Sequence, residues 1–252
     1  MKQVNWKQKM KDGITTDALW ITPRRINGRF EIPDREIFKD YTSSTFHGIF
    51  IPEIPYQFIK RFAENDGWIW DPFAGNDTTY YVAKKLGVQD RVIRSDINPL
   101  NAGILAGDAE FFNPLPYTNN NKLRLVFVHP PYWNRIIYSD KEGDLSNCKT
   151  LEQFYEKIGR IARNIYKYVE DGGYVILVCG NIWFNGEEID LGVNVKEKFR
   201  EAGFKCRSHI VKDYGEIQNN GKNYNLWYYR NLKNDSNFFY GDNIFLLKKV
   251  IE

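Results

Sequence analysis

The sequence predicts an α/β fold in which helices cover both faces of a mainly parallel β-sheet. From about residue 52 onward, short apolar runs of strand length alternate with stretches in which apolar residues recur every three or four positions. The run at 174–180, YVILVCG, is apolar in the manner of a strand buried on both faces. A chain of 252 residues with no internal repeat and no Pro- or Ser-rich linker fits one such domain. In this architecture ligands bind beyond the carboxyl ends of the strands.

The first half of the pattern begins with a helix over 51–64. Its prolines suit a first helical turn, and Ile54, Phe58 and Phe62 fall on one face. The elements predicted next are a strand at 68–71, a helix at 78–86, a strand at 91–96, a short helix at about 100–105 and a strand at 123–128.

The second half begins with a long helix that ends at the pair Gly172 and Gly173. Apolar residues in steps of three and four draw one stripe along it from Leu151 to Tyr168. The elements predicted after it are the strand at 174–180, a helix at 190–204, and strands at 206–214 and 243–250.

Composition places the chain among soluble globular proteins, with 42% hydrophobic and 27% charged residues, while aromatic residues are dense at 16%. No apolar run approaches the roughly 18 residues that span a bilayer, and the N-terminus lacks the apolar segment of a signal peptide. We therefore expect a cytoplasmic protein without a membrane partner. The three cysteines stand far apart, which predicts free thiols and no metal site.

Two segments stand apart from the alternating pattern. Residues 1–45 are predicted to be an N-terminal arm ahead of a single domain at 46–252, and the first 30 residues carry seven basic and two acidic side chains. Such an arm can lie along phosphates, although a solvated terminus has the same composition. The segment 213–243 is dense in Asn, Tyr and Gly and is longer than an ordinary connection. It is a candidate functional loop.

The string DPFAGNDTT at 71–79 lies between a predicted strand and a predicted helix. A turn with Gly75 lets a ligand approach backbone N–H groups at a helix N-terminus. Asp96 ends the next strand, where a carboxylate can accept hydrogen bonds from both hydroxyls of a ribose. Asp108 can similarly accept from an adenine amino group. A glycine turn followed by two surface acids is the plainer interpretation, but the order of the three features favours a nucleoside-containing cofactor.

The string HPPYWN at 129–134 follows the apolar strand at 123–128. Pro130 and Pro131 cannot continue a sheet, so they fix a rigid exit in which Tyr132 is presented. A tyrosine placed in this way can stack on a base that is flipped out of a duplex. The alternative is a strand that ends in a proline turn with Tyr132 as a core ring.

Together the two strings carry a family resemblance. DPFAGNDTT resembles the DPF(A/C)GSGTT cofactor motif, and HPPY resembles the (D/N/S)PP(Y/F) catalytic motif, of the DNA adenine and cytosine amino-methyltransferases. The upstream segment FHGIFIPEIPYQFI is similar to the segment that precedes the cofactor motif in many of these enzymes. The resemblance implies a Rossmann-like class I methyltransferase fold with a seven-stranded sheet. It also implies S-adenosyl-L-methionine as the methyl donor, and duplex DNA with an extruded base as the partner.

The same resemblance implies roles for individual residues. Position 129 and the carbonyl of Pro130 would accept the two hydrogens of the target amine, with no covalent intermediate. The catalytic set is then His129, Pro130, Pro131 and Tyr132. The cofactor set is Asp71, Phe73, Ala74, Gly75, Asn76, Thr78, Asp96, Ile97, Asp108 and Ala109.

Two positions depart from the family pattern. Asp77 replaces the second glycine of the cofactor motif, and Asp and Asn are the least costly non-glycine residues where a turn requires a positive φ. His129 replaces the usual Asp, Asn or Ser, and only a neutral imidazole has an acceptor nitrogen. We therefore expect a neutral His129 to accept from the target amine.

The substrate and the activity leave alternatives open. The residues expected to contact nucleic acid are Arg24, Arg25, Trp133, Tyr224, Trp227, Tyr228 and Arg230, because rings stack on bases and arginines meet phosphates. The rings of the 213–243 loop would equally form an aromatic cluster packed beneath it. RNA is an alternative substrate, and a catalytically silent nucleic-acid-binding subunit is the alternative to an enzyme. The target base and the oligomeric state do not follow from the sequence.

Overall fold

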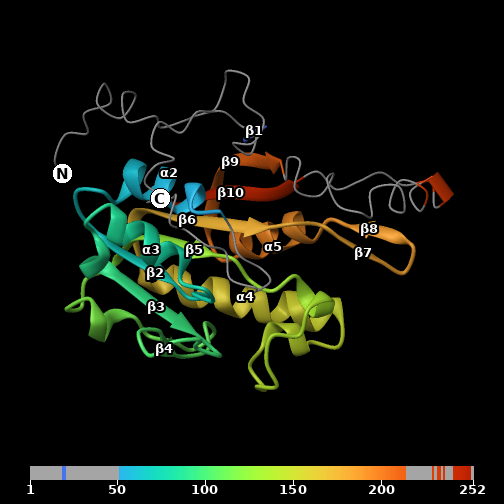
Figure 1. Cartoon of the computed structure of the whole chain (residues 1–252), viewed down its shortest axis with the longest axis horizontal. Helices are drawn as coiled ribbons and strands as arrows, with labels where there is room; N and C mark the ends of the chain where they lie inside the picture. Colours follow the sequence, from blue (N-terminus) through green and yellow to red (C-terminus); the bar gives the residue numbers. More distant parts are fainter. Residues whose placement is uncertain are drawn as a thin grey trace.

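A computed structural model describes residues 19–20, 51–213, 229, 232–233, 235 and 241–250. One sheet of eight strands runs through it in the order β1-β9-β10-β6-β5-β2-β3-β4 (Figure 1). Neighbouring strands are parallel except where β10 pairs with β6 and with β9. The strands are β1 Leu19–Trp20, β2 Trp68–Asp71, β3 Val92–Asp96, β4 Leu105–Ala106, β5 Leu123–Val128, β6 Val169–Cys179, β9 Phe204–Asp213 and β10 Gly241–Lys249.

This architecture confirms the predicted α/β class. Seven strands make the body of the sheet, and the two-residue β1 from the predicted N-terminal arm adds an eighth beside β9. The helices are α2 Glu53–Phe62, α3 Thr78–Lys85, α4 Leu151–Tyr168 and α5 Leu191–Glu201. Within the described residues, no helix has the length and apolar character required to cross a bilayer.

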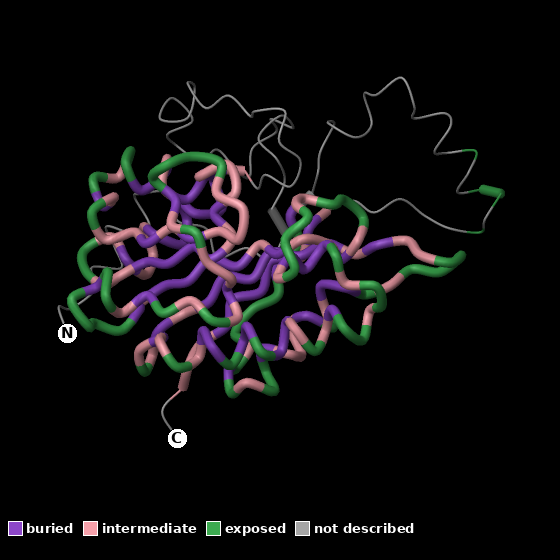
Figure 2. Tube along the Cα trace, turned by 90° about the horizontal axis from the view of Figure 1, so that it is seen from below, coloured by how far each residue is buried: buried purple, intermediate pink, exposed green. Residues whose placement is uncertain are grey.

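Alternate residues of the central strands point to two separate cores, one on each face of the sheet. Ile69 of β2 packs with residues of α2 and α3, whereas its neighbour Trp70 packs with residues of α4 and α5. The same alternation continues along β5, β6 and β10, which explains the uninterrupted apolar runs at 125–128, 174–179 and 244–247. Figure 2 shows the buried positions concentrated along the sheet, with exposed positions around them.

Two predicted elements are corrected. The segment predicted as a short helix at 100–105 forms turns followed by β4, because the Asn101 side chain accepts from the backbone N–H of Gly103 at 3.0 Å and closes a turn. The helix α4 ends at Tyr168, before the glycine pair, because Val169 already pairs with Leu123 in the sheet.

A small hairpin outside the main sheet was not predicted. Its strands are β7 Ile182–Phe184 and β8 Glu187–Ile189, and both turn residues, Asn185 and Gly186, have positive φ. An Asn-Gly pair is the usual sequence of such a two-residue turn. The signal was therefore present in the sequence.

Candidate active site

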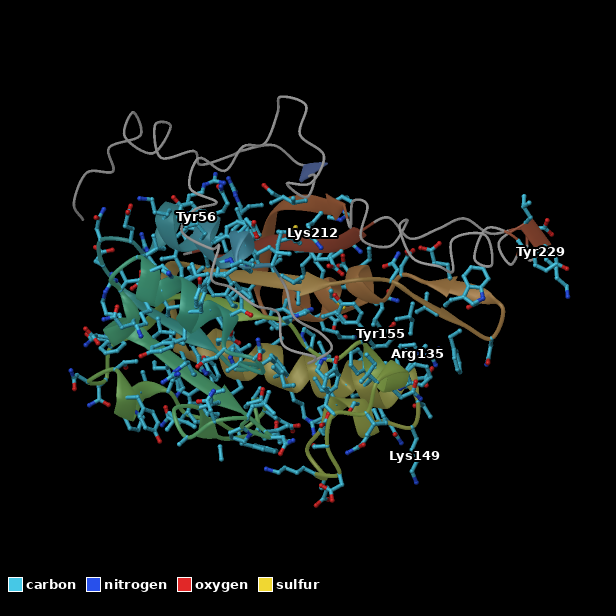
Figure 3. All side chains as sticks on the ribbon, in the orientation of Figure 1. Tyr56, Arg135, Lys149, Tyr155, Lys212 and Tyr229 are labelled. Atoms are coloured by element: carbon cyan, nitrogen blue, oxygen red, sulfur yellow. The ribbon has the colours of Figure 1, made fainter. Side chains whose placement is uncertain are left out.

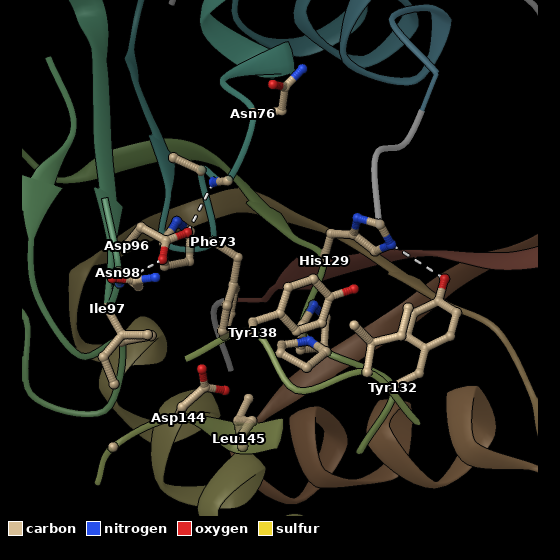
Figure 4. A pocket seen from close by; sticks show the side chains of 18 of the residues that line it. Phe73, Asn76, Asp96, Ile97, Asn98, His129, Tyr132, Tyr138, Asp144 and Leu145 are labelled. Atoms are coloured by element: carbon tan, nitrogen blue, oxygen red, sulfur yellow. Dashed lines mark hydrogen bonds between the residues drawn. The ribbon is translucent and has the colours of Figure 1, made fainter. Parts of the chain in front are cut away.

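The two motifs meet at one edge of the sheet. Strands β2, β3, β5 and β6 are mutually parallel, so their carboxyl ends share this edge. A cavity of about 500 Å³ opens there, lined by residues of both the 71–79 turn and the 129–132 corner. Figure 4 shows Phe73 and Asp96 on one side of it and His129 and Tyr132 on the other. Gly75 and Tyr132 therefore face a shared cleft.

Most of the predicted cofactor and catalytic residues line this cavity. Its lining includes the predicted residues Phe73, Ala74, Gly75, Asn76, Thr78, Asp96, Ile97, Asp108, Ala109, His129, Pro130, Pro131 and Tyr132. Within the part of the chain that the structure describes, no group of three or more His, Cys, Asp and Glu side chains could hold a metal ion.

The 71–79 turn is tied to the neighbouring strand through Asp96. One carboxylate oxygen of Asp96 accepts from the backbone N–H of Gly75 at 2.9 Å, and the other accepts from the backbone N–H of Asn98 at 2.8 Å. Burial raises the pKa of Asp96, and these two backbone bonds oppose the rise. Gly75 itself has a φ of 44°, which brings its backbone to the cavity wall without a side chain.

Asp71 acts behind the turn and does not line the cavity, which corrects its assignment to the cofactor wall. Its side chain is buried, accepts from the backbone N–H of Phe73 at 3.1 Å, and accepts from the Thr79 hydroxyl at 2.5 Å. It therefore joins the start of the turn to the first turn of α3. Desolvation raises the pKa of Asp71 to about 7, against the two hydrogen bonds.

Asp77 takes the left-handed conformation anticipated at the position of the family's second glycine. Its φ is 67°, and its carboxylate pairs with the Arg94 guanidinium at 2.6 Å. That guanidinium also lies 3.7 Å from the centre of the Tyr80 ring. Burial raises the pKa of Asp77, while the charge of Arg94 lowers it. The Asp77 side chain is thus held by a cation from β3.

The wall opposite the turn comes from Asp108 and from the loop after the catalytic corner. Asp108 accepts from the backbone N–H of Glu110 at 2.9 Å and lies 3.5 Å from the Lys157 ammonium, which also donates to the carbonyl of Gly143. There is no room for a side chain at Gly143, because an added Cβ would meet an Asp108 carboxylate oxygen at 2.4 Å. The loop is therefore packed directly on the predicted adenine-binding acid.

That loop contributes residues the sequence analysis did not select. Tyr138 and Asp144 line the cavity, and the buried Asp144 side chain accepts from Ser139 and from Ser146. Arg135 also lines the cavity and donates to the carbonyl of Trp183 in β7 at 3.1 Å. A loop of this kind carries no fixed motif, so its position is visible only in the fold.

The 129–132 corner places His129 and Tyr132 in contact. The Nε2 atom of His129 lies 3.3 Å from the Tyr132 hydroxyl, which donates to the Asp242 carboxylate at 2.8 Å. Desolvation lowers the pKa of His129 to about 4, since the charge of Asp242 only partly offsets it. A pKa of about 4 leaves the imidazole neutral at physiological pH.

Asp242 is the main residue that the sequence analysis missed. Asp242 is the second residue of strand β10, which runs antiparallel to β6, and its side chain lines the cavity. Because of that direction, the beginning of β10 lies at the same edge as the ends of the parallel strands. Lys212 on β9 is the residue directly opposite Asp242 in the sheet, and its buried ammonium lies 3.6 Å from the Asp242 carboxylate. Figure 3 shows Lys212 on β9. The only sign of this residue in the sequence is its position, as an acid directly before the predicted strand at 243–250.

Trp133 is placed in the core, which corrects its assignment to nucleic-acid contact. Its side chain is 2% exposed, and its indole N–H donates to the carbonyl of Cys148 at 2.9 Å. A φ of 53° at Trp133 turns the chain so that Tyr132 faces the cavity while the next ring faces inward.

The other predicted nucleic-acid contacts lie outside the described residues. These are Arg24, Arg25, Tyr224, Trp227, Tyr228 and Arg230. Within the 213–243 segment, the structure describes Tyr229 and Leu232 as exposed.

No protein-family model matches the chain, and no curated protein matches it. Solved structures share its general chain path. TrmN from Thermus thermophilus is 16% identical with a TM-score of 0.49, over 81% of this chain and 50% of TrmN. A SAM-dependent methyltransferase from Archaeoglobus fulgidus is 13% identical with a TM-score of 0.47, over 79% of this chain and 95% of that one. The [4+2]-cyclase SpnF is 15% identical with a TM-score of 0.42, over 80% of this chain and 81% of the cyclase.

The chain thus spans half the length of TrmN. At these identities a likeness concerns the fold alone, and proteins of one fold carry out different reactions. The activity has to be argued from the residues of the site.

Proposed function

We propose that this chain binds S-adenosyl-L-methionine and transfers its methyl group to the exocyclic amino group of adenine or cytosine in DNA. The observation that carries the proposal is the single cavity of about 500 Å³ that both motifs line. Its volume lies within the range of roughly 300–1,000 Å³ typical of small-molecule sites. A donor held by the turn and a base held by the corner would meet in it.

The residues present fit the adenosyl part of this cofactor. The two carboxylate oxygens of Asp96 each accept one backbone N–H, and an ionised carboxylate has about four acceptor positions in all. Capacity therefore remains for the two ribose hydroxyls. Asp108 is a second carboxylate at the cavity wall, two residues beyond β4, and in this proposal it accepts from the adenine amino group. The positive φ of Gly75 allows the close backbone approach that the methionine portion requires.

The catalytic corner fits the needs of an aromatic amine. When bound, the cofactor supplies a methyl group attached to a sulfonium, which is already electrophilic. The amine is a poor nucleophile because its lone pair is delocalised into the base, and two acceptors that hold its hydrogens turn the lone pair toward the methyl group. The carbonyl of Pro130 and a neutral His129 are the acceptors in this proposal, and the Tyr132 ring supports the extruded base.

The proposed reaction balances without an enzyme-bound intermediate. A bond forms between the amine nitrogen and the methyl carbon as the bond between that carbon and sulfur breaks. The donor would leave as a neutral thioether, and the amine nitrogen would release one proton to solvent water. The pair of acceptors at the corner stabilises the positive charge that develops on nitrogen before that release.

The test is mass spectrometry of nucleosides from both the DNA and the RNA of a host that expresses the chain. A methylated adenine or cytosine in DNA, absent with Asp96→Ala and present with the matched surface variant Asp90→Ala, supports the proposal. Methylation of RNA alone would move the substrate class to RNA. Absence of both, with S-adenosyl-L-methionine still bound in calorimetric titration, would mean a silent subunit.

A further inference from the structure

We infer that Asp242 is a positioning residue of this site: by holding the Tyr132 hydroxyl, it determines which ring nitrogen of His129 carries the hydrogen. The inference rests on the proposed function only where it calls the 129–132 corner catalytic. The hydrogen bonds that link the side chains of Asp242, Tyr132 and His129 do not depend on that proposal.

A hydroxyl has a single hydrogen to donate, and this sets the direction of the chain of bonds. The Tyr132 hydroxyl gives that hydrogen to an oxygen of Asp242 at 2.8 Å. Its contact with Nε2 of His129 at 3.3 Å is then a hydrogen bond only if Nε2 is the donor. A neutral His129 therefore carries its hydrogen on Nε2, and the lone pair is on Nδ1.

Asp242 is itself fixed from two sides. Lys212 lies opposite it in the sheet, with its ammonium 3.6 Å away, and both residues are buried. On the other side, a Cβ added at Gly180 would lie 2.9 Å from the Tyr132 ring and 3.1 Å from an Asp242 oxygen. The tyrosine ring and the carboxylate are therefore packed against a backbone that leaves little space for either to move.

This arrangement has two consequences for the site. The tyrosine ring keeps one orientation toward the cavity, which suits a surface that stacks on a base. Nδ1 becomes the ring nitrogen able to accept a hydrogen bond, and Figure 4 shows Nε2 turned toward Tyr132 with the other nitrogen turned away from it. The acceptor that the proposed function assigns to His129 is thus Nδ1.

The test is long-range ¹H–¹⁵N NMR of the imidazoles of the full-length chain, which has three histidines. His129→Asn assigns the relevant signals by their loss. In the wild type at pH 7, Nε2 of His129 is expected to resonate as a protonated nitrogen and Nδ1 as an unprotonated one. Asp242→Asn keeps an acceptor oxygen and should preserve this pattern, whereas Asp242→Ala frees the tyrosine hydrogen for Nε2 and should shift His129 toward the Nδ1–H form.

Asp171→Ala is the matched control, because Asp171 is also 3.6 Å from a lysine, Lys249, but does not line the cavity. It should leave the His129 signals unchanged. If Asp242→Ala does not fold, Tyr132→Phe poses the same question by removing the hydroxyl, and the Nε2–H preference should again weaken. The inference is overturned if His129 of the wild type carries its hydrogen on Nδ1, or if neither Asp242→Ala nor Tyr132→Phe changes the tautomer.

The turnover of methyl transfer separates this inference from the proposed function. Where the wild type is active, Asp242→Ala should lower kcat about tenfold or more, as for the loss of a hydrogen bond to a charged group, with cofactor affinity retained. An unchanged kcat overturns the positioning role. If the wild type transfers no methyl group but shows the expected tautomers, the proposed function is wrong and the role of Asp242 in setting the tautomer is retained.

Discussion

The backbone N–H of Gly75 donates to the Asp96 carboxylate at 2.9 Å, which joins two segments 21 residues apart in the chain. The bond places a carboxylate at the end of β3 directly against the turn that follows β2. A ligand with a vicinal diol can therefore contact the turn and the acid together. We therefore expect the Asp96 carboxylate to contribute to the affinity for the proposed cofactor.

Asp96→Ala is expected to weaken the binding of S-adenosyl-L-methionine by about 10- to 100-fold, the usual effect of losing hydrogen bonds to a charged group. Isothermal titration measures the affinity. Asp90→Ala removes an exposed carboxylate that precedes β3, at the opposite end of the strand from Asp96, and should leave the affinity unchanged. Equal affinities for the wild type and both variants would place the ligand elsewhere.

Asp77→Ala should destabilise the chain more than Asp77→Gly. Both variants lose the ion pair with Arg94, but only alanine must adopt a φ of 67° with a side chain that has no compensating bond. The left-handed conformation costs a non-glycine residue about 1–2 kcal/mol, which is the expected difference in the free energy of unfolding. Urea denaturation of the two variants side by side measures it, and an alanine variant as stable as the glycine variant would show that the turn is not strained.

Much of the fold was predictable because burial on both faces of the sheet leaves a direct trace in the sequence. Strands such as β5 must be apolar at successive positions, and α4 must carry one apolar stripe. The position of the 71–79 turn was predictable for a related reason: the ends of β2 and β3 can be located from the apolar runs, and the turn lies between β2 and α3.

The remaining parts of the site depend on tertiary structure. Tyr132 and Trp133 are adjacent rings after a double proline, and the positive φ at Trp133 decides that the first lines the cavity and the second is buried. Asp242 reaches the site only because β10 is antiparallel to its neighbours. Neither property is encoded in a local pattern, so sequence reasoning assigned Trp133 wrongly and did not select Asp242.

Asp71 should make the stability of the chain depend on pH. Its pKa is about 7 in the folded state against an ordinary value of 3.8, so between these values the folded chain binds a proton that the unfolded chain has lost. This contribution to the free energy of unfolding is present at low pH and is lost as pH rises through 7. Its upper limit is on the order of a few kcal/mol.

His129 acts in the opposite direction, since its folded pKa of about 4 lies below the ordinary 6.5 and its contribution grows as pH rises between them. Removing the Asp71 contribution with Asp71→Asn should therefore make the free energy of unfolding rise more steeply, or fall less, from pH 4.5 to pH 7. Denaturant titrations across that range give the curves, with the exposed Asp140→Asn as control. Parallel curves for wild type and Asp71→Asn would contradict the raised pKa.

The rate of methyl transfer should not show the titration of an ordinary histidine. If His129 accepts from the target amine, only its neutral form is active, and a pKa of about 4 keeps that form dominant well below pH 6.5. Single-turnover rates with saturating cofactor should therefore stay level, as far as His129 is concerned, from pH 8 to about 5.5. A rate that halves near pH 6.5 in the wild type would mean that the ring is solvated in the working complex. His129→Asn, which keeps an acceptor oxygen but cannot titrate, would then abolish that step in the profile while retaining partial activity.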